Sequence, residues 1–353
     1  MNALASAIQI AEQAPIPDRL TRLGIDCLVG AARRRMSRAP ADVEQAFARD
    51  MHVRAVAEHV AAANSQHYEL PAEFFTLALG PRRKYSSCYY ATAQDTLAEA
   101  EAGALTLTAE HADLADGQDV LELGCGWGSL SLWMAERFPR SRIVSVSNSQ
   151  SQRRFIQSVA AARRLENLEV ITADMNGFDA GEALDGRRFD RVVSVEMFEH
   201  MANWPRLLER VRSWLKPEGR LFLHVFTHKT SPYRFDVDDK TDWIAQHFFT
   251  GGVMPSHGLI RQFGGLFQVE AEWTWSGEHY RRTAMDWLAN FDRNDARIRE
   301  ILLKVYGPDA RLWRRRWRLF FLSVAGLFGH QGGSEWGVSH YRLAPADPGG
   351  AQA

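Results

Sequence analysis

Short apolar runs alternate with stretches of helical periodicity over most of the chain. From residue 119 onward, five runs rich in Val, Ile and Leu are typical of buried strands. They cover residues 119–123, 142–147, 168–172, 189–195 and 220–226. The helical stretches between them predict strand–helix–strand units and therefore a parallel sheet. Two later runs, 267–273 and 337–343, are candidates for two further strands.

The two ends of the chain follow a different pattern. Residues 1–66 are alanine-rich with helical periodicity and are interrupted by Pro15, Pro17 and Pro40, which predicts a helical N-terminal extension. An α/β domain then covers 67–345, with an aromatic-rich helical region at 285–327 inserted before the last strand. Residues 346–353 are expected to form a frayed tail.

The first predicted strand ends in a glycine-rich turn. Residues 120–128 read Val-Leu-Glu-Leu-Gly-Cys-Gly-Trp-Gly, and a helix is expected over 129–138. Glycines at Gly124, Gly126 and Gly128 allow a sharp turn and a close approach by a ligand. The dinucleotide fingerprint instead has the spacing Gly-x-Gly-x-x-Gly and holds a pyrophosphate. Here the last gap is one residue shorter, and Glu122 closes the strand. That acid opposes a diphosphate but suits a positively charged ligand; a structural turn and a nucleotide site are the alternatives.

The composition of the 353-residue chain narrows the class of protein. Its formal net charge is -1, so no overall field attracts nucleic acid. The sequence contains no run of about 18 apolar residues and no signal-peptide pattern at its start. The three cysteines, Cys27, Cys88 and Cys125, are scattered, which favours a reducing compartment and argues against a metal site. We therefore expect a cytoplasmic protein.

Polar residues follow the second and third predicted strands, where ligands bind in doubly wound sheets. The second strand is followed by Asn148 and Gln152 rather than by the usual acid. Their amide groups can donate and accept hydrogen bonds to ribose hydroxyls, although a helix cap at Asn148 explains the same turn. After the third strand, Asp174 could accept a hydrogen bond from an adenine amino group, and Met175 could cover its face.

Several separate motifs carry a resemblance to a known family. The segments 64–71, 73–75 and 84–90 and the run 195–201, which reads Val-Glu-Met-Phe-Glu-His-Met, resemble the cyclopropane fatty acid synthase superfamily of S-adenosylmethionine-dependent methyltransferases. The segments 248–256, 277–280, 320–329 and 335–336 are similar to the coclaurine N-methyltransferase type within it. The similarity runs from about residue 57 to about residue 343.

The resemblance implies a class I Rossmann-like methyltransferase fold with a seven-stranded, mostly parallel sheet and helical insertions over the active site. It implies S-adenosylmethionine as cofactor, whose sulfonium and ammonium groups suit Glu122. By the same resemblance Tyr85 and Ser86 close over the cofactor, and a set of later residues lines it: Gly124, Asn148, Gln152, Asp174 and Met175. The alternative for residues 85–90 is a polar-aromatic loop that packs on the domain.

Glu196, Glu199 and His200 follow the fourth predicted strand and are the candidate catalytic residues. On a helical first turn Glu196 and Glu199 would share a face, because they are three residues apart. The alternative is an acidic helix start that complements the helix dipole.

The same region separates two kinds of enzyme in the superfamily. As implied by the resemblance, cyclopropane synthases hold a bicarbonate base with residues that match Glu199, His224 and Tyr280. The synthases have Gly at the position of Glu196 and Cys at that of Val324. A carboxylate about 4 Å from bicarbonate would be repelled by roughly 4 kcal/mol at an effective dielectric constant near 20. Glu196 therefore favours a cationic substrate.

We thus predict an enzyme that transfers a methyl group from S-adenosylmethionine to the amine nitrogen of a small molecule, for which an alkaloid-like amine is a candidate. Glu196 and Glu199 would attract the ammonium form, and His200 would accept its proton, with Glu199 as the group that could orient it. Four aromatic side chains are candidates to wall the amine pocket through cation–π contact: Tyr85, Trp243, Tyr280 and Trp336. For each aromatic taken singly, core packing is the alternative.

Other functions stay open at this stage. A cyclopropane synthase-like enzyme acting on membrane lipid alkenes is one, since the basic, aromatic segment 311–318 could lie on an anionic bilayer. A helix with an exposed basic start and a buried apolar remainder is the favoured interpretation of that segment. A cofactor-binding scaffold without catalysis is a third class, and a homodimer is compatible with the sequence.

Overall fold

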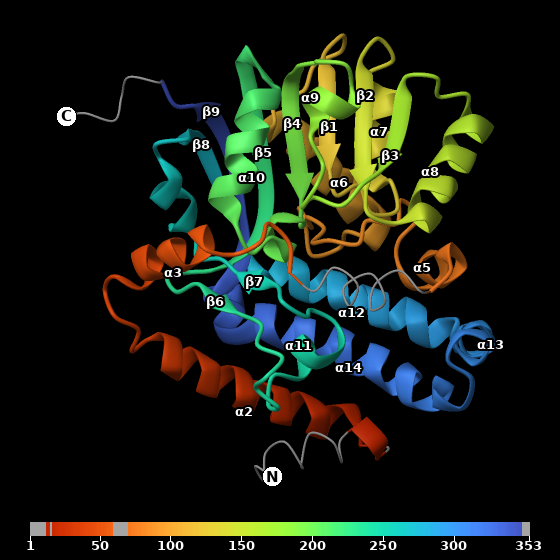
Figure 1. The fold of residues 1–353 in the computed structure, drawn as a ribbon. Helices are drawn as coiled ribbons and strands as arrows, with labels where there is room; N and C mark the ends of the chain where they lie inside the picture. Colours follow the sequence, from red (N-terminus) through yellow and green to blue (C-terminus); the bar gives the residue numbers. More distant parts are fainter. Residues whose placement is uncertain (1–11, 15, 59–69, 348–353) are drawn as a thin grey trace.

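The computed structural model describes residues 12–14, 16–58 and 70–347. Its central sheet has seven strands in the order β3-β2-β1-β4-β5-β9-β8 (Figure 1). Neighbouring strands from β3 to β5 pair in parallel, whereas β9 is antiparallel to both β5 and β8. The strands are β1 (Asp119–Leu123), β2 (Arg142–Ser147), β3 (Leu168–Thr172), β4 (Phe189–Val195), β5 (Leu215–His228), β8 (Phe267–Ser276) and β9 (Trp336–Pro345). The predicted seven-stranded, mostly parallel sheet is confirmed.

The first four strands have the predicted bounds, and each contains Val, Ile or Leu residues that are buried in the sheet. β5 begins at Leu215, five residues earlier than predicted, although residues 216–219 read as a turn. Leu215 pairs with Phe189 across an irregularity in the ladder, so the strand continues past the turn-like residues. A short hairpin-like pair, β6 (Tyr233–Arg234) and β7 (Val253–Met254), was not predicted.

Helices before, between and after the parallel strands cover the two faces of this part of the sheet (Figure 1). They are α6 (Leu97–His111), α7 (Ser129–Arg137), α8 (Gln150–Arg163), α9 (Ala180–Ala183) and α10 (Trp204–Trp214). The start of α6 is fixed by a capping box, in which Thr96 and Glu99 each bond the other's backbone N–H.

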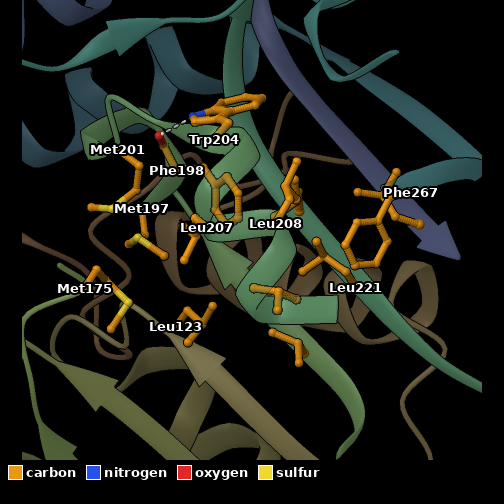
Figure 2. Packing of buried hydrophobic residues seen from close by; sticks show 14 of the residues in the cluster. Leu123, Met175, Met197, Phe198, Met201, Trp204, Leu207, Leu208, Leu221 and Phe267 are labelled. Atoms are coloured by element: carbon orange, nitrogen blue, oxygen red, sulfur yellow. Dashed lines mark hydrogen bonds between the residues drawn. The ribbon is translucent and has the colours of Figure 1, made fainter. Parts of the chain in front are cut away.

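The core between α10 and the sheet holds the turn that follows β4. Leu207 and Leu208 of α10 pack in one buried cluster with Leu221 of β5 and Phe267 of β8 (Figure 2). The indole of Trp204 donates a 2.8 Å hydrogen bond to the carbonyl of Phe198, drawn as a dashed line in Figure 2. This bond ties the candidate catalytic turn to a rigid helix.

A second layer of helices lies across the carboxyl ends of the parallel strands (Figure 1). It contains α2 (Asp18–Met36), α5 (Ala72–Ala78), α11 (Trp243–His247), α12 (Gly277–Arg293), α13 (Asp295–Tyr306) and α14 (Ala310–Gly329), and α3 (Val43–His52) lies beside it. The 285–327 region is thus three helices, because Asn294 and then Gly307, with φ of 52°, end the first two. None of the helices in the described ranges is long and apolar enough to cross a bilayer.

α14 packs against both α12 and α2, so the N-terminal part contributes to this layer. The predicted boundaries at residues 66 and 345 stay predictions. Residues 59–69, which include most of the 64–71 motif, and the tail from 348 lie outside the described residues.

Candidate active site

The glycine-rich turn leaves one position open to a ligand. Gly124, Gly126 and Gly128 all have positive φ, of 80°, 52° and 79°, which favours glycine. A Cβ on Gly124 would lie 2.5 Å from Met197, and one on Gly128 would lie 2.7 Å from Ile156. A Cβ on Gly126 would have no atom within 4 Å. Gly124 and Gly128 therefore allow packing within the protein, whereas Gly126 faces open space in the cavity wall.

Glu122 stands at the end of β1 with its carboxyl buried. It accepts hydrogen bonds from the hydroxyls of Ser131 and of Ser145, the latter at 2.8 Å. Burial raises the pKa of Glu122 to about 7, because the two hydroxyls offset only part of the cost of a buried charge. Glu122 also lines the cavity. A cationic ligand there would supply the missing positive charge.

The other predicted cofactor residues meet around the same cavity, at the carboxyl ends of β1, β2 and β3. The side chains of Asn148 and Asp174 are exposed. Oδ1 of Asp174 accepts a 2.9 Å hydrogen bond from the backbone N–H of Asn176. The amide oxygen of Gln152 accepts a 2.7 Å hydrogen bond from Ser147. All the predicted cofactor residues line the cavity: Tyr85, Ser86, Glu122, Gly124, Gly126, Asn148, Gln152, Asp174 and Met175.

Glu196 is the centre of the candidate catalytic cluster. Its Oε1 accepts from the backbone N–H of Ser87 at 2.9 Å and lies 3.2 Å from Nε2 of His224. Its Oε2 accepts from the hydroxyl of Tyr280 at 2.7 Å. Burial raises the pKa of Glu196, and the buried cation of Lys84 opposes this. One carboxylate thus joins the segment before α6, strand β5 and helix α12.

Glu199 lies beside Glu196 but not in the cavity wall. Its Oε1 accepts a 2.7 Å hydrogen bond from the backbone N–H of Phe226. Its Oε2 is buried and has no hydrogen-bond partner within the described part of the chain. Burial, followed by repulsion from Glu196, raises the pKa of Glu199. A buried carboxyl oxygen without a hydrogen-bond partner is uncommon in folded proteins, and here it lies beside a second carboxyl.

The local geometry of this turn differs from the expected helical start. Glu196 has φ of 46° and precedes the short 3₁₀ turn Phe198–His200, so Glu196 and Glu199 are not on one helical face. Within the described part of the chain Glu199 accepts a hydrogen bond from Phe226, and its role in orienting His200 stays a prediction. His200 itself lines the cavity, 4.4 Å from the ring of Phe249 between centroids.

The four predicted aromatic side chains separate into two groups. Tyr85 and Tyr280 line the cavity, whereas Trp243 and Trp336 lie outside its wall. Trp243 donates its indole N–H to the carboxylate of Glu12. The indole of Trp336 is buried and lies 3.3 Å from the hydroxyl of Tyr233. Both tryptophans therefore pack within the protein, which was the alternative to a cation–π contact in the amine pocket.

His224 also lies outside the cavity wall. It is a buried residue of β5 and contacts Glu196 from the side away from the cavity.

Several residues of the cavity wall were not predicted from the sequence. Lys84 is buried, and its Nζ donates to Ser86 at 2.5 Å and to the carbonyl of Ser87 at 2.6 Å. The only sequence signal for Lys84 is its place at the start of the 84–90 motif. The unpredicted apolar wall includes Trp127, Phe226, Phe249, Met254, Phe320 and Phe328.

The basic segment at the start of α14 makes ion pairs within the protein. Arg314 pairs with Asp295, and Arg316 pairs with Glu12 at 3.2 Å. Arg318 pairs with both Asp18 and Asp292. These pairs join α14 to α2, α12 and α13 and to Glu12, which precedes α2. The described residues contain no cluster of His, Cys, Asp and Glu with the geometry of a metal site.

Comparison with known proteins gives relatives over most of the chain. The family described as mycolic acid cyclopropane synthetase matches residues 56–330. (S)-coclaurine N-methyltransferase from Thalictrum flavum subsp. glaucum is 36% identical over 290 residues, which are 81% of this chain and 79% of that protein. Cyclopropane-fatty-acyl-phospholipid synthase from Escherichia coli strain K12 is 33% identical over 228 residues, or 64% of this chain and 55% of the synthase.

Solved structures give the same picture. A coclaurine N-methyltransferase bound to N-methylheliamine and SAH superposes with a TM-score of 0.91 at 31% identity and covers 97% of this chain and 99% of its own. A cyclopropane synthase from Mycobacterium tuberculosis, at 23% identity and a TM-score of 0.68, covers 82% of this chain and 99% of its own and shares the fold. The chain belongs to the mycolic acid cyclopropane synthetase family, as its motifs, its fold and these relatives show together.

Proposed function

We propose that this protein is an S-adenosylmethionine-dependent N-methyltransferase that acts on a small, alkaloid-like amine. The names of its relatives support this proposal, since they include (S)-coclaurine and pavine N-methyltransferases. The bound N-methylheliamine and SAH in the structural relative give the same support. One observation in this chain carries the choice of an amine over a lipid: the position of the Glu196 carboxylate.

Glu196 binds to the side chains that, by the family resemblance, would hold bicarbonate in a cyclopropane synthase. His224 and Tyr280 each contact one of its two oxygens, at 3.2 and 2.7 Å. This planar carboxyl group, fixed to the protein, thus occupies the place where a synthase would hold its base. In its ionised form it would repel a bicarbonate added beside it by about 4 kcal/mol at 4 Å and an effective dielectric constant near 20. An ammonium ion would be attracted by a similar amount.

The two buried carboxyls make the site selective for cations. Glu196 and Glu199 both have raised pKa values, chiefly because burial disfavours their charged forms. A bound ammonium ion would favour the ionised form of Glu196, which lines the cavity, and its charge would act on Glu199 from across the cavity wall. Tyr85 and Tyr280 of the cavity wall would add cation–π attraction, worth roughly 0.5–2 kcal/mol each.

The cavity residues at the ends of β1, β2 and β3 fit the cofactor. Gly126 leaves open space for it, and the buried carboxyl of Glu122 calls for a positive charge. Asn148 and Asp174 present exposed polar groups for the ribose and the base. When bound, S-adenosylmethionine supplies an electrophilic methyl group on its sulfonium. Holding the amine in line with that methyl group can contribute up to about 7–11 kcal/mol of the acceleration.

A proton must leave the substrate before the nitrogen can react. An alkyl ammonium ion has a pKa near that of lysine, about 10.4, so the free amine is scarce at neutral pH. His200 lines the cavity within the same turn as Glu199 and is our proposed base.

The cytoplasmic location, the homodimer and any contact with a membrane surface stay predictions.

The decisive experiment compares amines with lipids. The protein is incubated with methyl-labelled S-adenosylmethionine and either a panel of alkaloid-like amines that includes coclaurine, or unsaturated phospholipid vesicles, with and without bicarbonate. Because N-methylation and cyclopropanation each add one CH₂ to the product mass, the label is located by NMR or fragmentation. We expect label on the amine nitrogen and no effect of bicarbonate. Bicarbonate-stimulated cyclopropanation, without amine methylation, would overturn the proposal.

A further inference from the structure

Three histidines continue the hydrogen-bond network of Glu196 away from the cavity. Nε2 of His224 lies 3.2 Å from Oε1 of Glu196, and Nδ1 of the same ring lies 2.8 Å from Nε2 of His340. Nδ1 of His340 lies 2.7 Å from Nδ1 of His111. His224 and His340 therefore use both of their ring nitrogens in the network, and Nε2 of His111 is its outer end. His224 and His340 are fully buried, and His111 is partly exposed.

The fold holds these rings in line. His224 of β5 and His340 of β9 are directly paired residues of an antiparallel ladder, so their side chains lie on the same face of the sheet. His111 is the last residue of α6, and its ring stacks on Trp273 of β8 with a centroid distance of 3.8 Å and an interplanar angle of 3°. The ring of Trp275 packs on His340 from the side, 4.3 Å between centroids. The rings thus have little freedom to move out of register.

We propose that His224, His340 and His111 form a proton relay through which Glu196 exchanges a proton with solvent while substrate fills the cavity. This inference rests on the proposed function, because it takes a cationic amine to be the substrate. The contacts run along one face of the sheet, from Glu196 across β5 and β9 to His111 at the end of α6, which is partly exposed. It gives Glu196 a route to water that does not pass through the cavity.

The hydrogen-bond pattern allows two complete states of the relay. With Glu196 ionised, His224 donates to it through Nε2–H, His340 donates to His224 through Nε2–H, and His111 donates to His340 through Nδ1–H. With Glu196 protonated, every one of these hydrogen bonds reverses, and His111 carries its proton on Nε2. The two states differ by one proton in total and by no charge on any ring. Passage from the second state to the first releases one proton from Nε2 of His111.

Burial first, and nearby positive charges second, favour the neutral form of the three rings, as such a relay requires. Burial lowers the pKa of His224 and of His340, and the nearby cation of Lys84 lowers both further. Burial and Arg342 lower the pKa of His111 to about 4. At the inner end, Tyr280 and Lys84 stabilise the ionised Glu196, whereas burial favours its protonated form. Glu199 lies next to it with its own raised pKa.

Binding of the substrate creates the need for this route. In the empty site the raised pKa of Glu196 favours a carboxyl that keeps its proton. A bound ammonium ion, R₂NH₂⁺, stabilises the ionised carboxylate, so the overall step is Glu196–COOH + R₂NH₂⁺ → Glu196–COO⁻·R₂NH₂⁺ + H⁺. The amine itself blocks the cavity side of Glu196, and the displaced proton leaves through His224, His340 and His111.

The first test observes the rings directly. Histidine ¹⁵N chemical shifts distinguish Nδ1–H from Nε2–H, and they are recorded for His111, His224 and His340 across pH. We expect the three tautomers to switch together as Glu196 titrates, and again when a cationic amine is added at constant pH. In Glu196→Gln the joint switch should disappear. Independent titration of the rings, or no tautomer change at all, would overturn the relay even in a protein that methylates amines.

The second test uses turnover. His340→Phe and His111→Phe keep the aromatic packing but break the relay, and we expect kcat with a strongly basic amine to fall about tenfold, with an increased solvent isotope effect. A weakly basic amine, which binds neutral and displaces no proton, should be turned over at nearly the unaltered rate by both variants. His257→Phe is the matched control, because His257 forms hydrogen bonds with Ser339 and Tyr341 of β9 but has none with Glu196 or the three histidines.

Chemical rescue separates proton transfer from packing. In His111→Ala, added 4-methylimidazole should restore turnover of the basic amine, since it has both a donor and an acceptor nitrogen. Added 1-methylimidazole fills similar space but has no N–H, and it should not restore turnover. Equal rescue by both compounds, or unchanged kcat in His340→Phe and His111→Phe, would overturn the relay. If the unaltered protein methylates no amine, the proposed function fails, and the tautomer measurement still decides whether the relay exists.

Discussion

Tyr280 on α12 donates a 2.7 Å hydrogen bond to Oε2 of Glu196 at the end of β4, 84 residues away in the sequence. The bond makes the helical layer part of the catalytic cluster rather than a separate lid. It also orients a carboxylate whose Oε1 already faces Ser87 and His224. The cationic site is therefore assembled only when the sheet, the 84–90 segment and the C-terminal helices are all in place.

Replacement of Glu196 tests the selectivity for cations. Glu196→Gln keeps the size of the side chain but removes its charge, so we expect amine turnover to fall by up to about a thousandfold, which corresponds to about 4 kcal/mol. Affinity for S-adenosylmethionine, measured by calorimetry, should change little. Turnover close to that of the unaltered protein would contradict the electrostatic role of Glu196.

A smaller substitution at the same position tests the comparison with bicarbonate. Glu196→Gly frees the donors of Ser87, His224 and Tyr280, so we expect bicarbonate to bind where the carboxylate was. Binding can be followed by ¹³C NMR of labelled bicarbonate, with the unaltered protein as control. Weak activity on unsaturated lipid could follow, although Val324 stands where the synthases have a cysteine. No difference in bicarbonate binding between the two proteins would contradict this interpretation of the cluster.

Gly126 is the position where a side chain should affect the ligand and little else. Gly126→Val should abolish binding of S-adenosylmethionine and of SAH, because the new side chain would fill the open space in the cavity wall. Gly186→Val is the matched control. Gly186 also has a positive φ, of 76°, and a Cβ added there would have no atom within 4 Å, but it does not line the cavity. Both variants carry a backbone penalty of about 1–2 kcal/mol. Equal cofactor affinity in the two folded variants would contradict the assignment.

Glu122 should make cofactor binding depend on pH. Burial raises its pKa to about 7 in the empty site, and a cationic ligand favours the ionised form. Affinity for S-adenosylmethionine should therefore rise with pH up to about 7 and be level above it. Binding just below pH 7 should also release protons, which calorimetry in buffers of different ionisation enthalpy detects. Glu122→Gln should remove both effects; a pH-dependent affinity that survives in this variant would assign them to another group.

The sheet could be predicted because the parallel strands carry apolar segments that alternate with helical stretches, and β1 and β2 are buried along almost their full length. The glycine turn and the residues after β2 and β3 could be placed because ligands bind where parallel strands end. The directions of Trp243 and Trp336 could not, since a single aromatic residue gives no sign of which neighbour it packs against. The φ of Glu196 was missed for a similar reason, because a positive φ at a non-glycine residue is set by its tertiary contacts.

The histidine network was beyond the reach of sequence patterns. His111 and His340 are 229 residues apart, and they meet only because β9 inserts antiparallel between β5 and β8. A shift of one residue in the register of β9 would turn His340 to the opposite face of the sheet. His224 was predicted only through the family resemblance, and its second partner could not be inferred without that register.

Replacement of His200 tests which group accepts the proton of the substrate. If His200 is the base, methylation of a strongly basic amine should increase with pH through its titration and then level or fall as other groups titrate. His200→Ala should remove this lower limb and reduce kcat by about 10²–10⁴-fold, the usual contribution of a positioned acid or base. Cofactor affinity should change little, because the methyl donor does not need the base.

The basicity of the substrate provides a control for His200→Ala. A higher pH, where more free amine is present, should partly restore turnover by the variant, and turnover of a weakly basic amine should fall less. The pH profile of kcat in both proteins checks all of these outcomes. If His200→Ala keeps the kcat of the unaltered protein across pH with a strongly basic amine, then the proton leaves by another route, and Glu196 with its three histidines becomes the first candidate.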